Sequence, residues 1–209
     1  MFGETLTTRE RTWFDGFMSY SIRQLAGHEF ALLAPTLVDI YIAAMGYSPA
    51  IRRQRIDVWR GEITYPGFTA VIAIDESAEP ERVVGVAYGF TGARGRWWDQ
   101  QLIRGLKQAG ALTSQASAML DDYFEVAEVH VEAAHQGRGL GSRLVCELVR
   151  DVPSAWALLS TPEVPQERNA AFGLYRKLGF VDVVRNLMYA GDSRPFAVLG
   201  RRLPLRPAG

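Results

Sequence analysis

Residues 124–151 contain the sharpest change of hydrophobic pattern in the chain. Residues 124–131 are rich in valine at near-alternate positions, which predicts a strand. After the Gly-rich segment 136–142, apolar residues recur at helical spacing. These apolar residues are Leu140, Leu144, Val145, Leu148 and Val149. The pattern therefore predicts a strand, a tight loop and a helix in immediate succession.

The part of the chain before this stretch alternates between strand and helix patterns. Residues 17–25 predict a first strand, and Pro35 is predicted to open a helix that stops at Gly46. Ser48 is a favourable cap for a second helix at residues 49–61, which begins with a proline. We therefore expect one strand and two helices before the first hairpin.

A hairpin and a long connection come next. Residues 68–74 and 82–91 predict two strands joined by an acidic turn. The segment 92–122 then contains Trp97, Trp98 and two helical patterns, and it is longer than a simple connection between strands. We interpret it as an insert that forms a lid or one wall of a site, or that is anchored to the core by its two indole rings.

The end of the chain repeats the alternation of strand and helix. Residues 155–160 predict a buried strand, Asn169 begins a helix that Gly179 ends, and residues 180–189 and 196–202 predict a final hairpin. Interleaved strands and helices indicate the α/β class.

Length and composition restrict the organisation of the protein. A chain of 209 residues fits a single domain, which we place at residues 17–203. Residues 1–16 are expected to form a tail or a strap, and residues 204–209 a C-terminal tail. Lys plus Arg equals Asp plus Glu at 23 each, so no excess of positive charge points to nucleic acid.

The chain lacks the signals of secretion and of membrane insertion. We find neither a signal-peptide pattern nor an apolar run of about 18 residues, so we expect a cytoplasmic protein with no membrane partner. The single cysteine, Cys146, cannot form an internal disulfide, and we interpret it as a small buried hydrophobe. We expect no metal site.

The Gly-rich loop predicts an anion-binding site. Glycines let a backbone approach a ligand closely, and the first amides of the following helix have no partner within that helix. The loop lacks the Lys of a P-loop and the third Gly of a dinucleotide-binding fingerprint, because Ser142 stands in that place. The loop residues are Gln136, Gly137, Arg138, Gly139, Leu140, Gly141 and Ser142.

Two motifs together resemble the GNAT family of acetyl-CoA dependent N-acetyltransferases, and in particular its actinobacterial-type members. The first is Q-x-x-G-x-G, which begins at Gln136. The second is A-x-x-L-Y-x-x-x-G-F at residues 171–180. The resemblance covers residues 21–203 apart from the insert. It implies a GNAT-type fold, a twisted and mostly antiparallel sheet flanked by helices, with one parallel strand pair splayed open beside the loop. The helical insert at about 92–122 is an addition of this chain, because the family often has a short link there.

The resemblance also implies how acetyl-CoA is held. The loop amides and Arg138 would bind the pyrophosphate. The backbone of Val129, His130 and Val131 would pair with the pantetheine arm, and the amide of Val129 would help polarise the thioester carbonyl. Asn169 would bond the pantetheine, although it stands one position later than the family's Asn and is equally suited to capping a helix.

Acid and base candidates follow from the resemblance and from strand parity. Counting back from Val131 places the family's catalytic carboxylate at Glu125, and simple alternation puts it on the same face as Val129 and Val131. Glu128 has the opposite parity and would need a bulge to reach the same cleft. The phenol of Tyr175 occupies the position that protonates the leaving thiolate; the alternative is a tyrosine packed in the core.

These residues predict direct transfer of an acetyl group to a primary amine of a small molecule or a protein. The alternative is a module that binds acyl-CoA without turnover. The acceptor cannot be read from the sequence, because its walls carry no transferable motif. The C-terminal hairpin leaves a sheet edge through which a homodimer could form.

Overall fold

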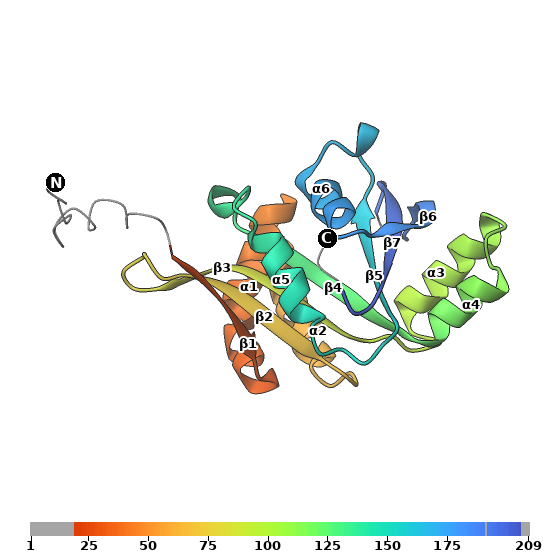
Figure 1. Ribbon diagram of the computed structural model, residues 1–209. Helices are drawn as coiled ribbons and strands as arrows, with labels where there is room; N and C mark the ends of the chain where they lie inside the picture. Colours follow the sequence, from red (N-terminus) through yellow and green to blue (C-terminus); the bar gives the residue numbers. More distant parts are fainter. Residues whose placement is uncertain (1–18, 191, 206–209) are drawn as a thin grey trace, which may run out of the picture.

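The computed structural model describes residues 19–190 and 192–205, which form a seven-stranded sheet with helices on both faces (Figure 1). The order of the strands is β1-β2-β3-β4-β5-β7-β6, and every neighbouring pair is antiparallel except β4 and β5. The strands are β1 (Tyr20–Leu25), β2 (Thr69–Asp75), β3 (Arg82–Thr91), β4 (Tyr123–Val131), β5 (Trp156–Pro162), β6 (Val181–Met188) and β7 (Pro195–Arg202). The mixed, mostly antiparallel sheet confirms the expected fold class.

The helices divide between the two faces of the sheet. The longer ones are α1 (Gly27–Met45), α2 (Arg52–Glu62), α3 (Trp97–Gln108), α4 (Ser114–Asp121), α5 (Leu140–Leu148) and α6 (Ala170–Lys177). Short 3₁₀ turns are η2 (Pro49–Ile51), η3 (Ala133–His135) and η4 (Pro165–Glu167). Helices α5 and α6 share one hydrophobic cluster with the sheet, whereas α1 with α2 and α3 with α4 cover alternate strand residues on the other face.

The first helix begins earlier than its sequence predicts. Helix α1 starts at Gly27 and continues through Pro35, so the prediction that Pro35 opens the helix is wrong. A proline inside a helix leaves the carbonyl four residues earlier without its usual donor. Here that carbonyl belongs to Ala31, and it accepts a hydrogen bond of 3.0 Å from Nε of Arg60 on α2. The neighbouring helix thus replaces the bond that Pro35 removes.

Helix α1 is also apolar enough to pass for a membrane span by length and composition, with a mean hydropathy of 1.3. This contradicts the absence of such a run expected from the sequence. The apolar side chains of α1 include Phe30, Leu37 and Tyr41, which are buried with residues of the sheet. In this fold α1 therefore packs as a core helix.

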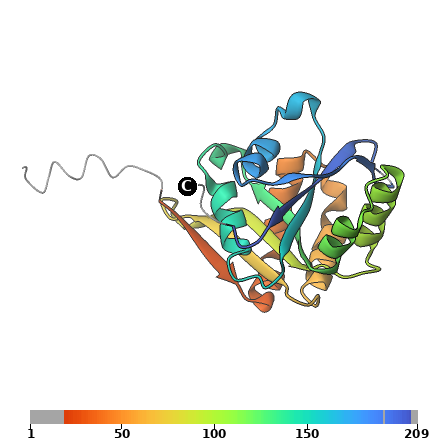
Figure 2. The ribbon, with the colours of Figure 1, turned by 45° about the vertical axis from the view of Figure 1, so that its right-hand side comes forward.

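The insert consists of two helices that cover the β6–β7 end of the sheet (Figure 2). Gly110, with a φ of +64°, separates α3 from α4, and the side chain of Thr113 caps α4. Trp98 is buried and its indole Nε1 donates to the hydroxyl of Tyr189 at 2.9 Å, whereas Trp97 is 56% exposed. One of the two indole rings, that of Trp98, therefore anchors the insert, as the second interpretation of the insert expected of both.

The structure also bears on the predictions for Cys146, for the C-terminal hairpin and for the two tails. Cys146 is exposed rather than buried, because the core side of α5 is formed by Leu140, Leu144 and Leu148 and Cys146 lies off that side. Strand β6 is an edge of the sheet, as expected of the C-terminal hairpin, and its pairing with a second copy stays a prediction. The expected tail at residues 1–16 lies outside the described residues, as does most of the one at 204–209.

Candidate active site

A cleft of about 1080 Å³ opens where β4 and β5 diverge. The two strands pair only through residues 123–125 and 156–158, and beyond Glu125 they separate. One end of the cleft is lined by the Gly-rich loop and α6, and the other by α1, α3 and the β6–β7 hairpin. The site predicted from the sequence is therefore a single cavity that passes through the gap in the sheet.

The Gly-rich loop has the backbone conformation that an anion site requires. Gly137 and Gly139 adopt φ values of +76° and +77°, which favour glycine. A Cβ on Gly141 would approach Leu174 to 3.0 Å, so this glycine lets α5 pack closely against α6. The amides of the first turn of α5 have no acceptor within the helix and lie at the positive end of its dipole. The loop therefore fits a pyrophosphate.

The side chains of the loop hold it in place. Nε2 of Gln136 donates to the carbonyl of Val131 at 2.9 Å, which fixes the loop to the end of β4. Arg138 donates to the hydroxyl of Tyr20 at 2.8 Å, and Arg143 to the backbone carbonyl of the same tyrosine at 2.9 Å. These bonds show that both arginines tie the loop and α5 to β1.

The open edge of β4 presents backbone groups to the cleft. The amide of Glu132 donates to the carbonyl of Val84 on β3 at 2.9 Å. Because amides alternate in direction along a strand, those of Val129 and Val131 point away from β3 and into the gap. The backbone of His130 points toward β3. Val129 therefore offers its amide and carbonyl to the cleft, whereas Val131 offers its amide, because its carbonyl already accepts from Gln136. All three residues predicted to pair with pantetheine line the cleft.

Helix α6 contributes the second motif. Asn169 is its N-cap, and the side-chain oxygen accepts a hydrogen bond of 2.8 Å from the amide of Phe172. Asn169 thus performs the capping role that was the alternative to pantetheine binding, and it also lines the cleft. Tyr175, on the same helix, is 7% exposed and lines the cleft as well. Burial raises the pKa of its hydroxyl above the ordinary value, which keeps the phenol protonated.

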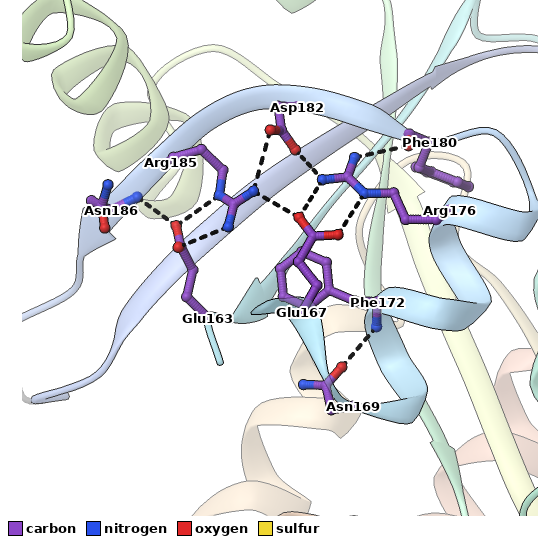
Figure 3. A network of polar contacts seen from close by, with 9 residues as sticks. All are labelled: Glu163, Glu167, Asn169, Phe172, Arg176, Phe180, Asp182, Arg185 and Asn186. Atoms are coloured by element: carbon purple, nitrogen blue, oxygen red, sulfur yellow. Dashed lines mark hydrogen bonds and ion pairs between the residues drawn. The ribbon is translucent and has the colours of Figure 1, made fainter. Parts of the chain in front are cut away.

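A network of charged residues holds the segment before α6 (Figure 3). Glu167 accepts from Arg176 at 2.7 Å and from Arg185 at 2.8 Å, and Glu163 binds Arg185 at 2.9 Å. Asp182 joins both arginines. Glu167 has a φ of +55°, an uncommon conformation for a residue with a side chain. The network therefore fixes a strained turn that leads directly into Asn169.

A β-bulge brings the two carboxylates of β4 onto one face. Tyr88 pairs with Glu128, but the next residue, Gly89, pairs with Val126, so Ala127 is the extra residue. Residues directly opposite in an antiparallel pair share a face. Glu125 is opposite Phe90 and Glu128 is opposite Tyr88, and both of these aromatic residues belong to the cluster beneath α1 and α2.

The expectation that Glu125 shares the face of Val129 and Val131 is therefore wrong. The bulge reverses the alternation between residues 125 and 129, so Glu125 lies with Glu128 and His130. The side chain of His130 lies on the face opposite that of Val129, because the two residues are adjacent on the regular part of the strand. Gly89 makes this arrangement possible, because a Cβ there would lie 2.2 Å from the carbonyl oxygen of Glu125.

The two carboxylates differ in their surroundings. Glu125 is 9% exposed, and burial together with the nearby charge of Glu62 raises its pKa to about 8. Glu128 lines the cleft, and its Oε2 lies 2.6 Å from Nε2 of His130, whose ring meets that of Tyr41 edge to face. Glu128 is thus directly accessible, whereas Glu125 lies deeper.

Some residues around the cleft carry no signal in the sequence. Glu62, at the end of α2, accepts a hydrogen bond of 2.6 Å from the hydroxyl of Tyr88, and burial raises the pKa of its carboxyl. Tyr47 and Arg194 are hydrogen-bonded at 2.5 Å although 147 positions separate them. Tyr189 lines the cleft beside Trp98. Only the folded chain brings these residues to the site, and no spacing rule would have found them.

Comparisons with known proteins agree with this geometry. A family model described as "Acetyltransferase (GNAT) domain" matches residues 66–182. A protein of Mycobacterium tuberculosis named "GCN5-like protein acetyltransferase Rv2170" is 38% identical over 186 residues, which cover 80% of this chain and 90% of that protein. The match with this relative extends well beyond the two motifs.

Solved structures show the same fold at low sequence identity. The protein yncA of Salmonella typhimurium, solved with its cofactor acetyl-CoA, is 17% identical with a TM-score of 0.57, covering 90% of this chain and 96% of that one. Aminoglycoside 6'-acetyltransferase type Ii is 17% identical with a TM-score of 0.58, covering 90% and 99%. The chain therefore belongs to the GNAT family of acetyltransferases and is an acyltransferase whose co-substrate is acetyl-CoA.

Proposed function

We propose that the protein transfers an acetyl group directly from acetyl-CoA to a primary amine. The observation that carries this proposal is the continuity of one cleft, which joins the loop amides, Tyr175 and Glu128 through the gap between β4 and β5. Cys146 does not line the cleft, so no cysteine is available there for an acyl-enzyme. The supporting geometry therefore favours a ternary complex.

The amine must lose a proton before it attacks the thioester. In this proposal the ammonium group enters beside Glu128, and the proton passes through a water to Glu125. A carboxylate with a pKa near 8 is suited to hold a proton taken from an amine at neutral pH. The shared face created by the bulge at Ala127 supports this route.

The remaining steps fall to β4 and α6. The amide of Val129 points into the gap and would stabilise the oxyanion that forms on the thioester carbonyl. The carbon–sulfur bond then breaks, and the hydroxyl of Tyr175 would protonate the leaving thiolate. A free thiol has a pKa near ~8.5, so a donor already in contact assists its departure.

The first experiment measures thiol release from acetyl-CoA in the presence of a panel of amines, with calorimetry of acetyl-CoA binding in parallel. Release that depends on an amine supports the transferase. Tight binding without release for any amine, together with no effect of Glu125→Gln, supports the alternative, a module that binds acyl-CoA without turnover. Trapping of an acetyl group on the protein along the pathway would exclude direct transfer.

Both classes of acceptor have a supporting comparison. The mycobacterial relative is named a protein acetyltransferase, and one structural neighbour is an aminoglycoside acetyltransferase. We therefore keep the primary amine of a small molecule or of a protein as the proposed acceptor class, and turn to the acceptor half of the cleft to narrow it.

A further inference from the structure

The acceptor half of the cleft lies between two groups of elements on one face of the sheet. Helices α1 and α2 cover β1 to β4, and α3 with the β6–β7 hairpin covers the strands beyond. Between these groups β4 and β5 diverge, which leaves a compartment above Glu128. Whatever reaches Glu128 from this face must pass between the two groups.

An arginine and a tyrosine join the two groups of elements across the cleft. Nη2 of Arg194, on the β6–β7 hairpin, donates to the hydroxyl of Tyr47, which follows α1, at 2.5 Å. Asp192 binds the same guanidinium at 2.7 Å, so the charge of Arg194 is compensated in place. All three residues line the cleft. The Tyr47–Arg194 contact therefore spans the compartment.

A similar contact joins the groups near the paired end of β4 and β5. The guanidinium of Arg96, just before α3, lies 4.1 Å from the centre of the Tyr65 ring, in the turn after α2. Arg96 also donates to the carbonyl of Thr91 at 2.8 Å, which fixes its position. Neither Arg96 nor Tyr65 lines the cleft, so this contact ties the two groups together beside the cleft, and the Tyr47–Arg194 contact is the one that crosses it.

Aromatic side chains from both groups of elements line the cleft. Tyr41 stands on α1, Trp97 and Trp98 on α3, and Tyr189 on the hairpin, and all line the cleft. Aromatic faces attract ammonium groups and pack against methylene groups. Glu128 provides a carboxylate at the inner end. This lining suits an apolar chain that ends in a cation.

From this geometry we propose that the acceptor is an unbranched primary alkylamine, threaded between the rings past the Tyr47–Arg194 contact. This inference rests on the proposed transferase activity. The same chemistry occurs in a free diamine and in the side chain of a lysine within a peptide. Branched or ring-substituted amines, such as aminoglycosides, would have to displace the Tyr47–Arg194 contact to reach Glu128.

The test compares acceptors at saturating acetyl-CoA: 1,5-diaminopentane, an N-acetylated peptide with one internal lysine, a lysine-free peptide with a free α-amine, and kanamycin. We expect kcat/KM for the diamine or the lysine peptide to exceed that for the other two by about tenfold or more, a difference of about 1.4 kcal/mol. The better of the first two identifies the source of the amine. Equal or higher values for kanamycin would overturn the inference and leave the transferase intact.

Two variants test the contact itself. Tyr47→Phe removes only the hydroxyl, and Arg194→Ala removes the guanidinium. Both should lower the preference for the linear amine over kanamycin at least threefold, without changing the dissociation constant of acetyl-CoA measured by calorimetry. Arg53→Ala, at an exposed position of α2 outside the cleft, is the matched control and should keep the preference.

An unchanged preference in both cleft variants would show that the contact does not select the acceptor. Absence of thiol release with every amine would overturn the proposed function and this inference with it.

Discussion

Glu125 and Glu128 lie three residues apart on β4 and still face the same side of the sheet. In a regular strand their side chains would point to opposite faces. The extra residue, Ala127, restores a shared face and places both carboxyls beneath α1 and α2, near Glu62. A pair of acidic groups thus approaches the acceptor side of the cleft from one strand.

The pH dependence of the reaction should reveal Glu125. Its pKa is raised to about 8, and a base must be deprotonated to act, so kcat should rise as the pH increases through about 8. Glu125→Gln should lose this rise and lower kcat on the order of 10²-fold or more. The comparison is Glu128→Gln, which removes the carboxylate that lines the cleft but leaves Glu125 in place. A Glu125→Gln enzyme with the same inflection near pH 8 would assign the base elsewhere.

The same raised pKa predicts an effect on stability. The folded state holds the Glu125 proton up to about pH 8, whereas the unfolded chain releases it near ~4.3, so the free energy of unfolding falls as the pH rises between these values. Glu125→Gln removes this dependence on pH, so the variant should be more stable than the parent at pH 8 by several kcal/mol, at about 1.4 kcal/mol per pKa unit. Each kcal/mol corresponds to a Tm roughly 2–4 °C higher. At pH 4 the difference should vanish. A thermal melt of both proteins at the two pH values decides the point.

Tyr175→Phe separates acid catalysis from packing. The variant keeps the ring, so it should fold and bind acetyl-CoA as before, while kcat falls on the order of 10²-fold. Rates must be measured where chemistry rather than product release is limiting. Tyr123→Phe is the matched control, because that buried hydroxyl has no hydrogen-bond partner among the described residues and does not line the cleft. Equal turnover in the Tyr175 variant and this control would make Tyr175 a core residue only.

Gly89→Ala tests the close approach of β3 to the bulge. The added Cβ would meet the carbonyl oxygen of Glu125 at 2.2 Å, so backbone must move and the protein should lose about 1–3 kcal/mol of stability. Gly61→Ala is the control, because nothing lies within 4 Å of its Cβ and alanine favours the helix. Urea unfolding of the two variants should shift in opposite directions. Equal midpoints would mean that the strand pair adjusts without cost.

Glu167→Gln tests the network before α6. The change weakens the bonds to Arg176 and Arg185 that hold the turn leading into Asn169. We expect KM for acetyl-CoA to rise a few-fold, with little change in kcat, and we expect high salt to raise the parent's KM in the same direction. Asp121→Asn breaks an exposed ion pair with Arg94 away from the cleft and is the control. A fall in kcat without a change in KM would contradict a positioning role.

The local elements were predictable because each depends on residues close in the sequence. The loop and α5 follow from the glycines at 137 and 139 and the apolar spacing after them. Ser48 marks a helix start that its side chain caps. The second motif likewise placed Tyr175 on a helix beside the cleft. In these cases local chemistry and the final fold agree.

The errors came from interactions between distant segments. Pro35 predicts a helix start, but it lies inside α1. The helix tolerates it because Arg60 on another helix bonds the carbonyl that Pro35 leaves without a donor. The predicted face of the Glu125 side chain was wrong, because the bulge depends on how β3 and β4 pair. The acceptor compartment was invisible for the same reason, since Tyr47 and Arg194 meet only after the sheet has formed.

The bulge at Ala127 makes the length of β4 as important as its composition. Removing or adding one residue between Glu125 and Val129 would shift the alternation of side chains along the strand by one position. Every side chain on one side of the change would exchange its surroundings, core for cleft or cleft for core. A substitution on this strand changes one side chain and leaves the others on their faces. A change in its residue count would instead move the Glu125 carboxylate to the other face, away from the cleft side on which it is proposed to act with the backbone of Val129.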